Sequence, residues 1–218
     1  KRVSFDVRKA FDPVVPMASQ PYILIVHPNL PGRSVKELIA HSKGQSLSYG
    51  SSGVGTVAHI GLEYLTTLTG AQFVHVPYKG GGQALLALLG GEIQMYPGLL
   101  LSGGPPIKGG KVRALAALSL KRITALPHLP TVAEQGFPGF KITNSYSLFA
   151  PAGTPQRIVT AINRHVGEFM NGPQMAQKLT AEGSQPGERM SPDEFRAAFA
   201  RDYEEVEKQI RQIKVKLY

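Results

Sequence analysis

Cysteine is absent from this chain of 218 residues. Its absence excludes disulfide bonds and thiolate ligands for a metal, and it leaves the compartment open because a core of this size needs no covalent cross-link. Long apolar runs are lacking as well, since those at Ile23–Val26 and Leu85–Leu89 are short. A membrane-spanning helix needs about 20 apolar residues, so the sequence predicts none.

Acidic residues are scarce relative to basic ones, 15 against 24, which gives a formal net charge of +9 at pH 7. This excess favours anionic ligands. The basic residues are dispersed, with short clusters at Lys1–Arg2, Lys121–Arg122 and Lys208–Lys216. No basic run is interleaved with aromatic residues, so we interpret the charge as solubilising and expect no nucleic-acid partner.

The patterns that carry catalysis are also lacking. There is no Gly-x-Ser-x-Gly, no Gly-Lys-Ser/Thr after a glycine-rich turn and no complete dinucleotide fingerprint. The acids nearest the glycine turns, Glu63 and Glu92, lie at ordinary positions and are not paired. All histidines except His59 lack metal-type spacing, and we expect surface or core roles for them: His27, His41, His75, His128 and His165. We therefore expect no enzyme, no cofactor and no metal.

What is present indicates a globular α/β protein, with 42% hydrophobic and 18% charged residues. Strands and helices alternate along the chain, which predicts a mainly parallel sheet. We expect separate strands at Val14–Met17 and Tyr22–His27, the second one buried and flanked by prolines, and a strand at Ile93–Tyr96. The segment Leu99–Lys108 predicts a looser connection.

Helix starts are marked by three motifs in the second half of the chain. Thr131-Val-Ala-Glu134 predicts a cap for a short helix that Gly136 ends. Thr154-Pro155 predicts an N-cap and first helical residue for a helix to Met170. Ser191-Pro-Asp-Glu194 predicts the start of the last helix.

Two glycine-rich turns are the most informative feature. Ser51–Thr56, the first glycine turn, and Lys79–Gly82, the second glycine turn, each follow a predicted strand and precede a predicted helix. A helix N-terminus has unpaired N–H groups and a partial positive charge, so each turn suits an anion. Each could also be no more than an N-cap with structural glycines. Because both lie at the carboxyl ends of neighbouring strands, they predict a shared ligand crevice.

With these motifs established, the chain resembles the tripartite tricarboxylate transporter receptors, the TctC or Bug family of periplasmic solute-binding proteins. The most specific segments are YGSSGVGTVAHIGLEYL and VHVPYKGGGQALLALLGGEIQM. Further matching segments follow in the family's order: VHPNLPGRSVKELIAHSK, IKGGKVRALAALSLKR, ALPHLPTVAEQGFPGF and LFAPAGTPQRIVTAIN. The resemblance extends over nearly everything from about Phe11 to Tyr218.

The resemblance implies the type II periplasmic-binding-protein fold, a Venus flytrap of two lobes with mainly parallel sheets. The hinge strands would be Tyr22–His27 and Ser145–Phe149. The second lobe, residues 28–144, would carry the glycine turns, and the first lobe would comprise residues 1–27 and 145–218. We expect the first lobe to be incomplete, because nothing here matches the family's opening strand and glycine-rich loop.

The resemblance also implies a ligand site. Family members bind a small carboxylate with backbone N–H and hydroxyl groups that correspond here to Ser51, Ser52, Gly53, Gly55 and Thr56. His59 is a further candidate, which could point into the crevice or pack on the sheet. The remaining expected contacts are Tyr78, Lys79, Gly80, Pro97 and Tyr146. Pro97 stands where family members commonly have an aspartate, which puts the usual dicarboxylate specificity in doubt.

We therefore expect a non-enzymatic receptor that captures a small organic carboxylate for the membrane components of a tripartite tricarboxylate transporter. The resemblance implies a periplasmic location, although the opening KRVSFDVRKAFD contains no apolar signal region. The alternative is a family remnant that binds no ligand and self-associates through the incomplete first lobe.

Overall fold

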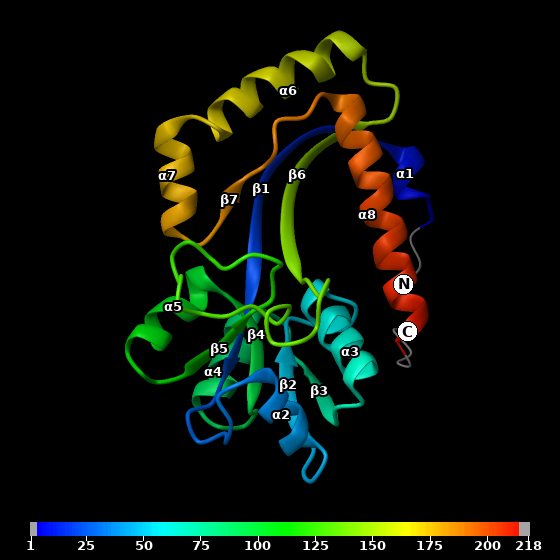
Figure 1. Ribbon diagram of the computed structural model, residues 1–218. Helices are drawn as coiled ribbons and strands as arrows, with labels where there is room; N and C mark the ends of the chain where they lie inside the picture. The colour runs from blue at the N-terminus through cyan, green and yellow to red at the C-terminus, as the bar shows by residue number, and fades with distance from the viewer. Residues whose placement is uncertain (1–3, 214–218) are drawn as a thin grey trace. The chain divides into compact units, whose positions relative to one another are not determined.

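The computed structural model describes residues 4–213, in which helices and strands alternate (Figure 1). The helices are α1 (Val7–Ala10), α2 (Val35–Ser42), α3 (Val57–Thr69), α4 (Gly81–Leu89), α5 (Leu100–Lys108), α6 (Gln156–Met170), α7 (Pro173–Ala181) and α8 (Pro192–Gln212). The strands are β1 (Phe11–Val26), β2 (Leu47–Ser51), β3 (Phe73–Pro77), β4 (Met95–Leu99), β5 (Arg113–Ala117), β6 (Thr143–Pro151) and β7 (Gln185–Pro186). The α/β class is confirmed. None of the helices within residues 4–213 is long and apolar enough to cross a membrane.

The chain forms two compact units. Of the described residues, unit 1 contains 4–20 and 145–208, and unit 2 contains 21–144 and 209–213. The glycine turns and all but one of the candidate site residues belong to unit 2, and the exception is Tyr146.

The sheet of unit 2 is mixed. Its strand order is β3-β2-β4-β1-β5, with β2 parallel to both β3 and β4, and with β1 antiparallel to β4 and β5. The carboxyl ends of β2, β3 and β4 therefore meet at one edge. Both glycine turns begin at this edge, where β2 and β3 end.

Both faces of this sheet are covered. Along β1, Leu24 and Val26 pack into a core that includes residues of α2 and α3. Ile23 and Ile25 pack on the other face, into a core that includes residues of α4. All four side chains are fully buried, and the alternation follows from the two-residue period of a strand. The prediction of a buried strand at this place is confirmed.

The strands predicted at Val14–Met17 and Tyr22–His27 form one strand, β1, and the prediction of a break between them is wrong. Ala18 and Ser19 pair with β7, and the pairing with β4 starts at Tyr22. Pro21 lies between these two ladders. Its missing N–H group therefore interrupts neither of these two ladders. Strand β6 also pairs with β1.

The prediction of a strand that ends at Tyr96 is also wrong, because β4 extends to Leu99 and contains Pro97. Pro97 lies opposite Leu24 of β1, whereas β2 pairs with β4 only at Met95. The side of β4 next to β2 thus needs no N–H from Pro97.

The segment predicted as a loose connection, Leu99–Lys108, is mostly helical. Helix α5 contains Pro105 and Pro106, and its Gly103 lies against the sheet. A Cβ added at Gly103 would lie 2.5 Å from Ile25 Cδ1. Close packing on the sheet thus outweighs the weak intrinsic helix propensity of a proline- and glycine-rich segment.

Two predicted helix starts in the second half of the chain are wrong. The Thr131–Glu134 capping bonds form, with Glu134 N–H donating to Thr131 Oγ1 (3.0 Å), but no helix follows. Instead, Val132 N–H donates to Ala117 O, so the sheet edge holds the segment. The Thr154 hydroxyl donates to Pro151 O and does not cap α6, whose N-cap is Pro155.

Unit 1 has a small core formed by Val14, Val15, Ala150 and Val159. Val159 is the one buried residue of α6, and α7 has none. The predicted end of α6 at Met170 and the capping bonds of Ser191 with Glu194 at the start of α8 are confirmed.

Candidate functional site

The first glycine turn is held by its own hydrogen bonds. The Ser51 hydroxyl oxygen accepts from Gly53 N–H (3.1 Å), and the Thr56 hydroxyl donates to Gly53 O (2.8 Å). Gly53 and Gly55 have φ angles of 138° and 79°. Residues with a Cβ rarely adopt such angles, so the turn requires glycine at both positions.

The start of α3 is uncapped. Ile60 N–H makes the first backbone bond, to Thr56 O, and the side chain of the N-cap residue Thr56 makes no capping bond. In the described part of the chain, the amides of Ser52, Val54 and Val57 have no partner. A Cβ placed on Gly55 would meet nothing within 4 Å. Unpaired donors and open space thus lie together, as an anion-binding helix start requires.

The second glycine turn leads into α4 in a similar way. Lys79 N–H donates to Gln83 Oε1 (3.2 Å), and the N-cap Gly80 offers no side chain to cap the helix. A Cβ on Gly80 or Gly82 would meet open space. The backbone of this helix start is accordingly open to a ligand.

The two glycine turns are neighbours in unit 2. Tyr78 N–H donates to Ser51 O (3.0 Å), which extends the parallel pairing of β2 with β3 into the turns. A Cβ on Gly53 would lie 3.7 Å from Tyr78 O, and one on Gly50 would lie 3.2 Å from Tyr78 Cε2. The sequence placed both turns at one sheet edge, and these contacts show how close they are.

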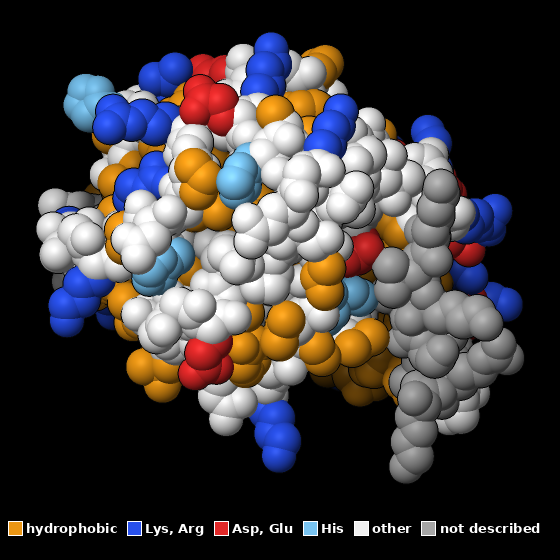
Figure 2. Space-filling model, turned by 90° about the horizontal axis from the view of Figure 1, so that it is seen from below, with side chains coloured by type: hydrophobic (Ala, Val, Ile, Leu, Met, Phe, Trp, Pro, Cys, Tyr) orange, Lys and Arg blue, Asp and Glu red, His pale blue; other side chains and the backbone are white. Residues whose placement is uncertain are grey.

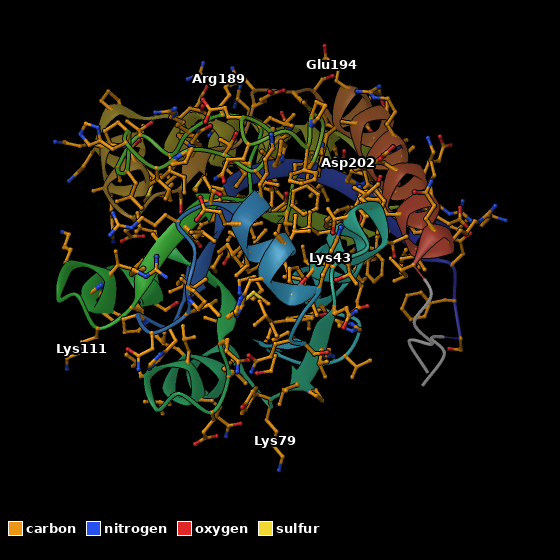
Figure 3. The ribbon with its side chains drawn as sticks, turned by 60° about the horizontal axis from the view of Figure 1, so that its bottom comes forward. Lys43, Lys79, Lys111, Arg189, Glu194 and Asp202 are labelled. Atoms are coloured by element: carbon orange, nitrogen blue, oxygen red, sulfur yellow. The ribbon has the colours of Figure 1, made fainter. Side chains whose placement is uncertain are left out.

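Charge near the second turn is peripheral. Lys79 is exposed and points away from the body of the protein (Figure 3). On the face shown in Figure 2, Lys and Arg side chains lie apart, with hydrophobic and uncharged groups between them. The donors at the turns are therefore mainly backbone groups.

Two stacked histidines support the first glycine turn. His59 of α3 is 1% exposed and stacks on His75 of β3, with ring centroids 3.8 Å apart. Gly55 N–H donates to His59 Nδ1 (3.1 Å). His75 Nε2 lies 2.7 Å from the Ser51 hydroxyl oxygen. Of the two alternatives for His59, the structure has the packed one. His59 contacts the turn at Gly55, and His75 contacts it at Ser51.

Burial keeps these histidines neutral at pH 7. It lowers the pKa of His75 to about 4, and the neighbouring His59 adds to this shift. Burial likewise lowers the pKa of His59, which Glu63 partly opposes. A neutral ring with no proton on Nδ1 can accept the Gly55 N–H bond, so the shifted pKa preserves the geometry of the turn.

A buried hydrogen bond lies deeper in the same cluster. The Tyr49 hydroxyl donates to Glu63 Oε1 (2.6 Å), and both residues are buried. Burial, and then Glu63, raise the pKa of Tyr49. From the sequence, Glu63 was expected at an ordinary helix position. The four-residue spacing of His59 and Glu63, which puts them on one face of α3, was the signal that could have linked them.

The other candidates differ in position. Pro97 is buried in β4, beside Tyr96. Tyr146 lies on β6 in unit 1, and its contribution to a site in unit 2 stays a prediction. Among residues 4–213, no three His, Asp or Glu side chains gather as metal ligands would.

Comparison with known proteins gives a consistent result. The family model described as the tripartite tricarboxylate transporter family receptor matches residues 1–215. The chain is 32% identical over 204 residues to protein BugT of Bordetella pertussis, a match that covers 91% of this chain and 61% of BugT. The chain thus spans about three fifths of that relative's length.

Solved structures share the fold. The structure of R. palustris Rpa4515 with adipate is 34% identical with a TM-score of 0.84, and the match covers 96% of this chain and 71% of that one. MatC from Rhodopseudomonas palustris with bound malate is 25% identical with a TM-score of 0.84, over 96% of this chain and 73% of that one.

Proposed function

We propose, from the premise that the chain belongs to the tripartite tricarboxylate transporter receptor family, that it is a receptor for a small organic carboxylate. The main observation behind this proposal is that α3 and α4 of unit 2 have neighbouring starts without side-chain caps, and that the glycine backbone at each start is open. Such helix starts favour an anion through their unpaired N–H groups and their partial positive charge. The adipate and malate in the solved relatives support this class of ligand.

The candidate residues take two kinds of role in this proposal. Ser52, whose N–H group has no partner in the described structure, would face the carboxylate together with the backbone of Gly53 and the open backbone at Gly55. The Thr56 hydroxyl, which donates to Gly53 O in this structure, would turn to the ligand. Ser51 and His59 hold the turn, because their side chains are already bonded within it. We propose that Tyr78, Lys79, Gly80 and Pro97 of unit 2 line the same site. The role of Tyr146 stays a prediction.

The biological setting follows from the family. A receptor of this kind is not an enzyme, and we propose that this chain performs no catalysis and uses no cofactor. It would deliver its ligand to the membrane components of a tripartite tricarboxylate transporter, in the periplasm. This part of the proposal rests on family membership.

The first prediction is that titration calorimetry with a panel of aliphatic mono- and dicarboxylates, aromatic acids and amino acids gives at least one saturable ligand. The ligand should also raise the melting temperature, because a molecule that binds only the native state stabilises it. A panel without any binder would overturn the receptor proposal.

One observation favours self-association as the second candidate. Phe169 of α6 is 63% exposed, and α6 and α7 of unit 1 bury a single residue between them. Apolar surface of this kind is commonly covered by a partner. Light scattering during the same titrations separates the two: the receptor is a monomer that responds to ligand, and the self-associating module is a dimer that does not.

A further inference from the structure

Tyr96 of β4 is a buried tyrosine that the sequence analysis did not select. It is 6% exposed, and its ring packs with Ala84 and Leu88 of α4. A Cβ on Gly98 would lie 2.7 Å from Tyr96 Cε1, so only glycine leaves room for the ring here. The ring is thereby fixed between the sheet and α4.

The hydroxyl of Tyr96 reaches the N-terminus of α4. A Cβ built on Gly81, the first residue of this nine-residue helix, would lie 2.6 Å from the Tyr96 hydroxyl oxygen. In the described part of the chain this hydroxyl has no hydrogen-bond partner, whereas the buried Tyr49 hydroxyl is bonded to Glu63. The Tyr96 hydroxyl oxygen is not among the fully buried polar atoms without a partner in residues 4–213, so it is accessible to a ligand atom.

The helix start beside this hydroxyl also has unused donors. The first backbone bond of α4 is donated by Ala84 to Gly80 O, so the amides of Gly81 and Gly82 stay unpaired in the described structure. The hydroxyl remains protonated at neutral pH, because burial raises the pKa of Tyr96 to about 12. Three donors without a partner in the described structure therefore belong to the start of α4 and its neighbour Tyr96.

Within residues 4–213, burial and Tyr22 are the causes of the raised pKa of Tyr96, and no Asp or Glu is among them. Pro97, which follows Tyr96, carries no charge. Glu92, the acid that raises the pKa of Tyr78 together with burial, lies beyond the C-terminal end of α4. An oxygen acceptor is therefore favoured beside Tyr96, and an ammonium group is disfavoured by the donors and by the partial positive charge of the helix start.

We propose that the Tyr96 hydroxyl and the amides at the start of α4 form a second recognition position, which selects carboxylates that carry another oxygen acceptor and rejects those that carry an ammonium group. This inference rests on the proposed function, with the first carboxylate bound at α3. Tyr96 is then a specificity-determining residue, and the chain discriminates against amino acids.

The test is a comparison of Tyr96→Phe with the wild type. Calorimetry measures affinity for succinate, adipate and suberate, for butyrate, hexanoate and octanoate, and for the ω-amino acids of the same lengths. Three ligand lengths are used so that at least one acid is long enough to reach from the start of α3 to the start of α4. We expect the wild type to prefer a diacid to its monoacid and to bind the amino acid least.

Tyr96→Phe should remove at least about fivefold of the diacid's advantage, as the loss of one hydrogen bond predicts, and should leave the monoacid unchanged. Tyr64→Phe is the matched control, because Tyr64 packs on Phe140 in the same unit and belongs to neither turn. It should keep the wild-type ratios.

A second measurement keeps the test independent of the variant's folding. In wild-type protein with ¹³Cζ-labelled tyrosine, the Tyr96 signal should shift with the preferred diacid and not with its monoacid. Diacid binding with an unchanged Tyr96 signal, or an unchanged diacid-to-monoacid ratio in Tyr96→Phe, would overturn the inference and leave the receptor function standing. A wild type that binds none of the acids would overturn both.

Discussion

Replacing Gly55 with valine is expected to weaken carboxylate binding by a factor of about ten or more. The φ angle of Gly55 is 79°, in the left-handed region that costs about 1–2 kcal/mol for residues with a Cβ, and a β-branched side chain is still less suited to it. When the backbone relaxes, the Gly55 N–H bond to His59 breaks and the donors of the turn diverge. Calorimetry with the ligand from the panel measures the loss.

Gly70→Val is the control that separates strain from binding. Gly70 ends α3 with a φ angle of 65°, and a Cβ there would also meet nothing within 4 Å. It should lower stability to a similar extent and keep wild-type affinity. Thr56→Val removes one hydroxyl group and should weaken carboxylate binding by about 1 kcal/mol. Equal, small losses of affinity in all three variants would place the ligand elsewhere.

Lowering the pH from 7.5 to 5.0 should reduce stability by about 1–2 kcal/mol through His75, with a smaller loss in the same direction through His59. The pKa of His75 is about 4 in the folded protein, against 6.5 as the ordinary value. The unfolded chain therefore binds more protons between these values, so the free energy of unfolding falls as pH falls below 6.5. The magnitude allows for the partial exposure of His75.

Urea unfolding at pH 7.5, 6.5, 5.5 and 5.0 measures this loss. His75→Gln keeps a polar side chain beside Ser51 and removes the titrating ring, so its stability should fall less between the same pH values. Identical pH dependence of the variant and the wild type would show that His75 is not held neutral by the fold.

The parts of the fold that local patterns determine were predictable. The buried strand at residues 22–26, the helix that Gly70 ends, and the two glycine turns at one sheet edge follow from hydrophobic runs and turn chemistry. Predictions failed where tertiary pairing decided the outcome. Pro21 does not break β1, because it lies between two ladders, and the Thr131 capping motif starts no helix, because the sheet edge binds the segment.

The candidate site shows the same division. The glycine positions of the first turn were predictable, because a backbone with a positive φ angle strongly favours glycine and the sequence shows glycine at 53 and 55. The His59–His75 stack was not, because it joins a helix to a strand 16 residues further along the chain, and only the packed sheet brings them together. Tyr96 was missed for a related reason. Its ring fits beside α4 only because Gly81 and Gly98 have no Cβ, and this contact is not visible in the sequence.

Amide chemical shifts in ¹⁵N-labelled protein test the central claim most directly. Titration with the best carboxylate of the panel should shift the amides of residues 52–58 at the start of α3 and of residues 80–83 at the start of α4. Residues at the far ends of these helices, such as Gly70 and Gly90, should change least. Saturable binding with shifts that leave both helix starts unaffected would contradict the account.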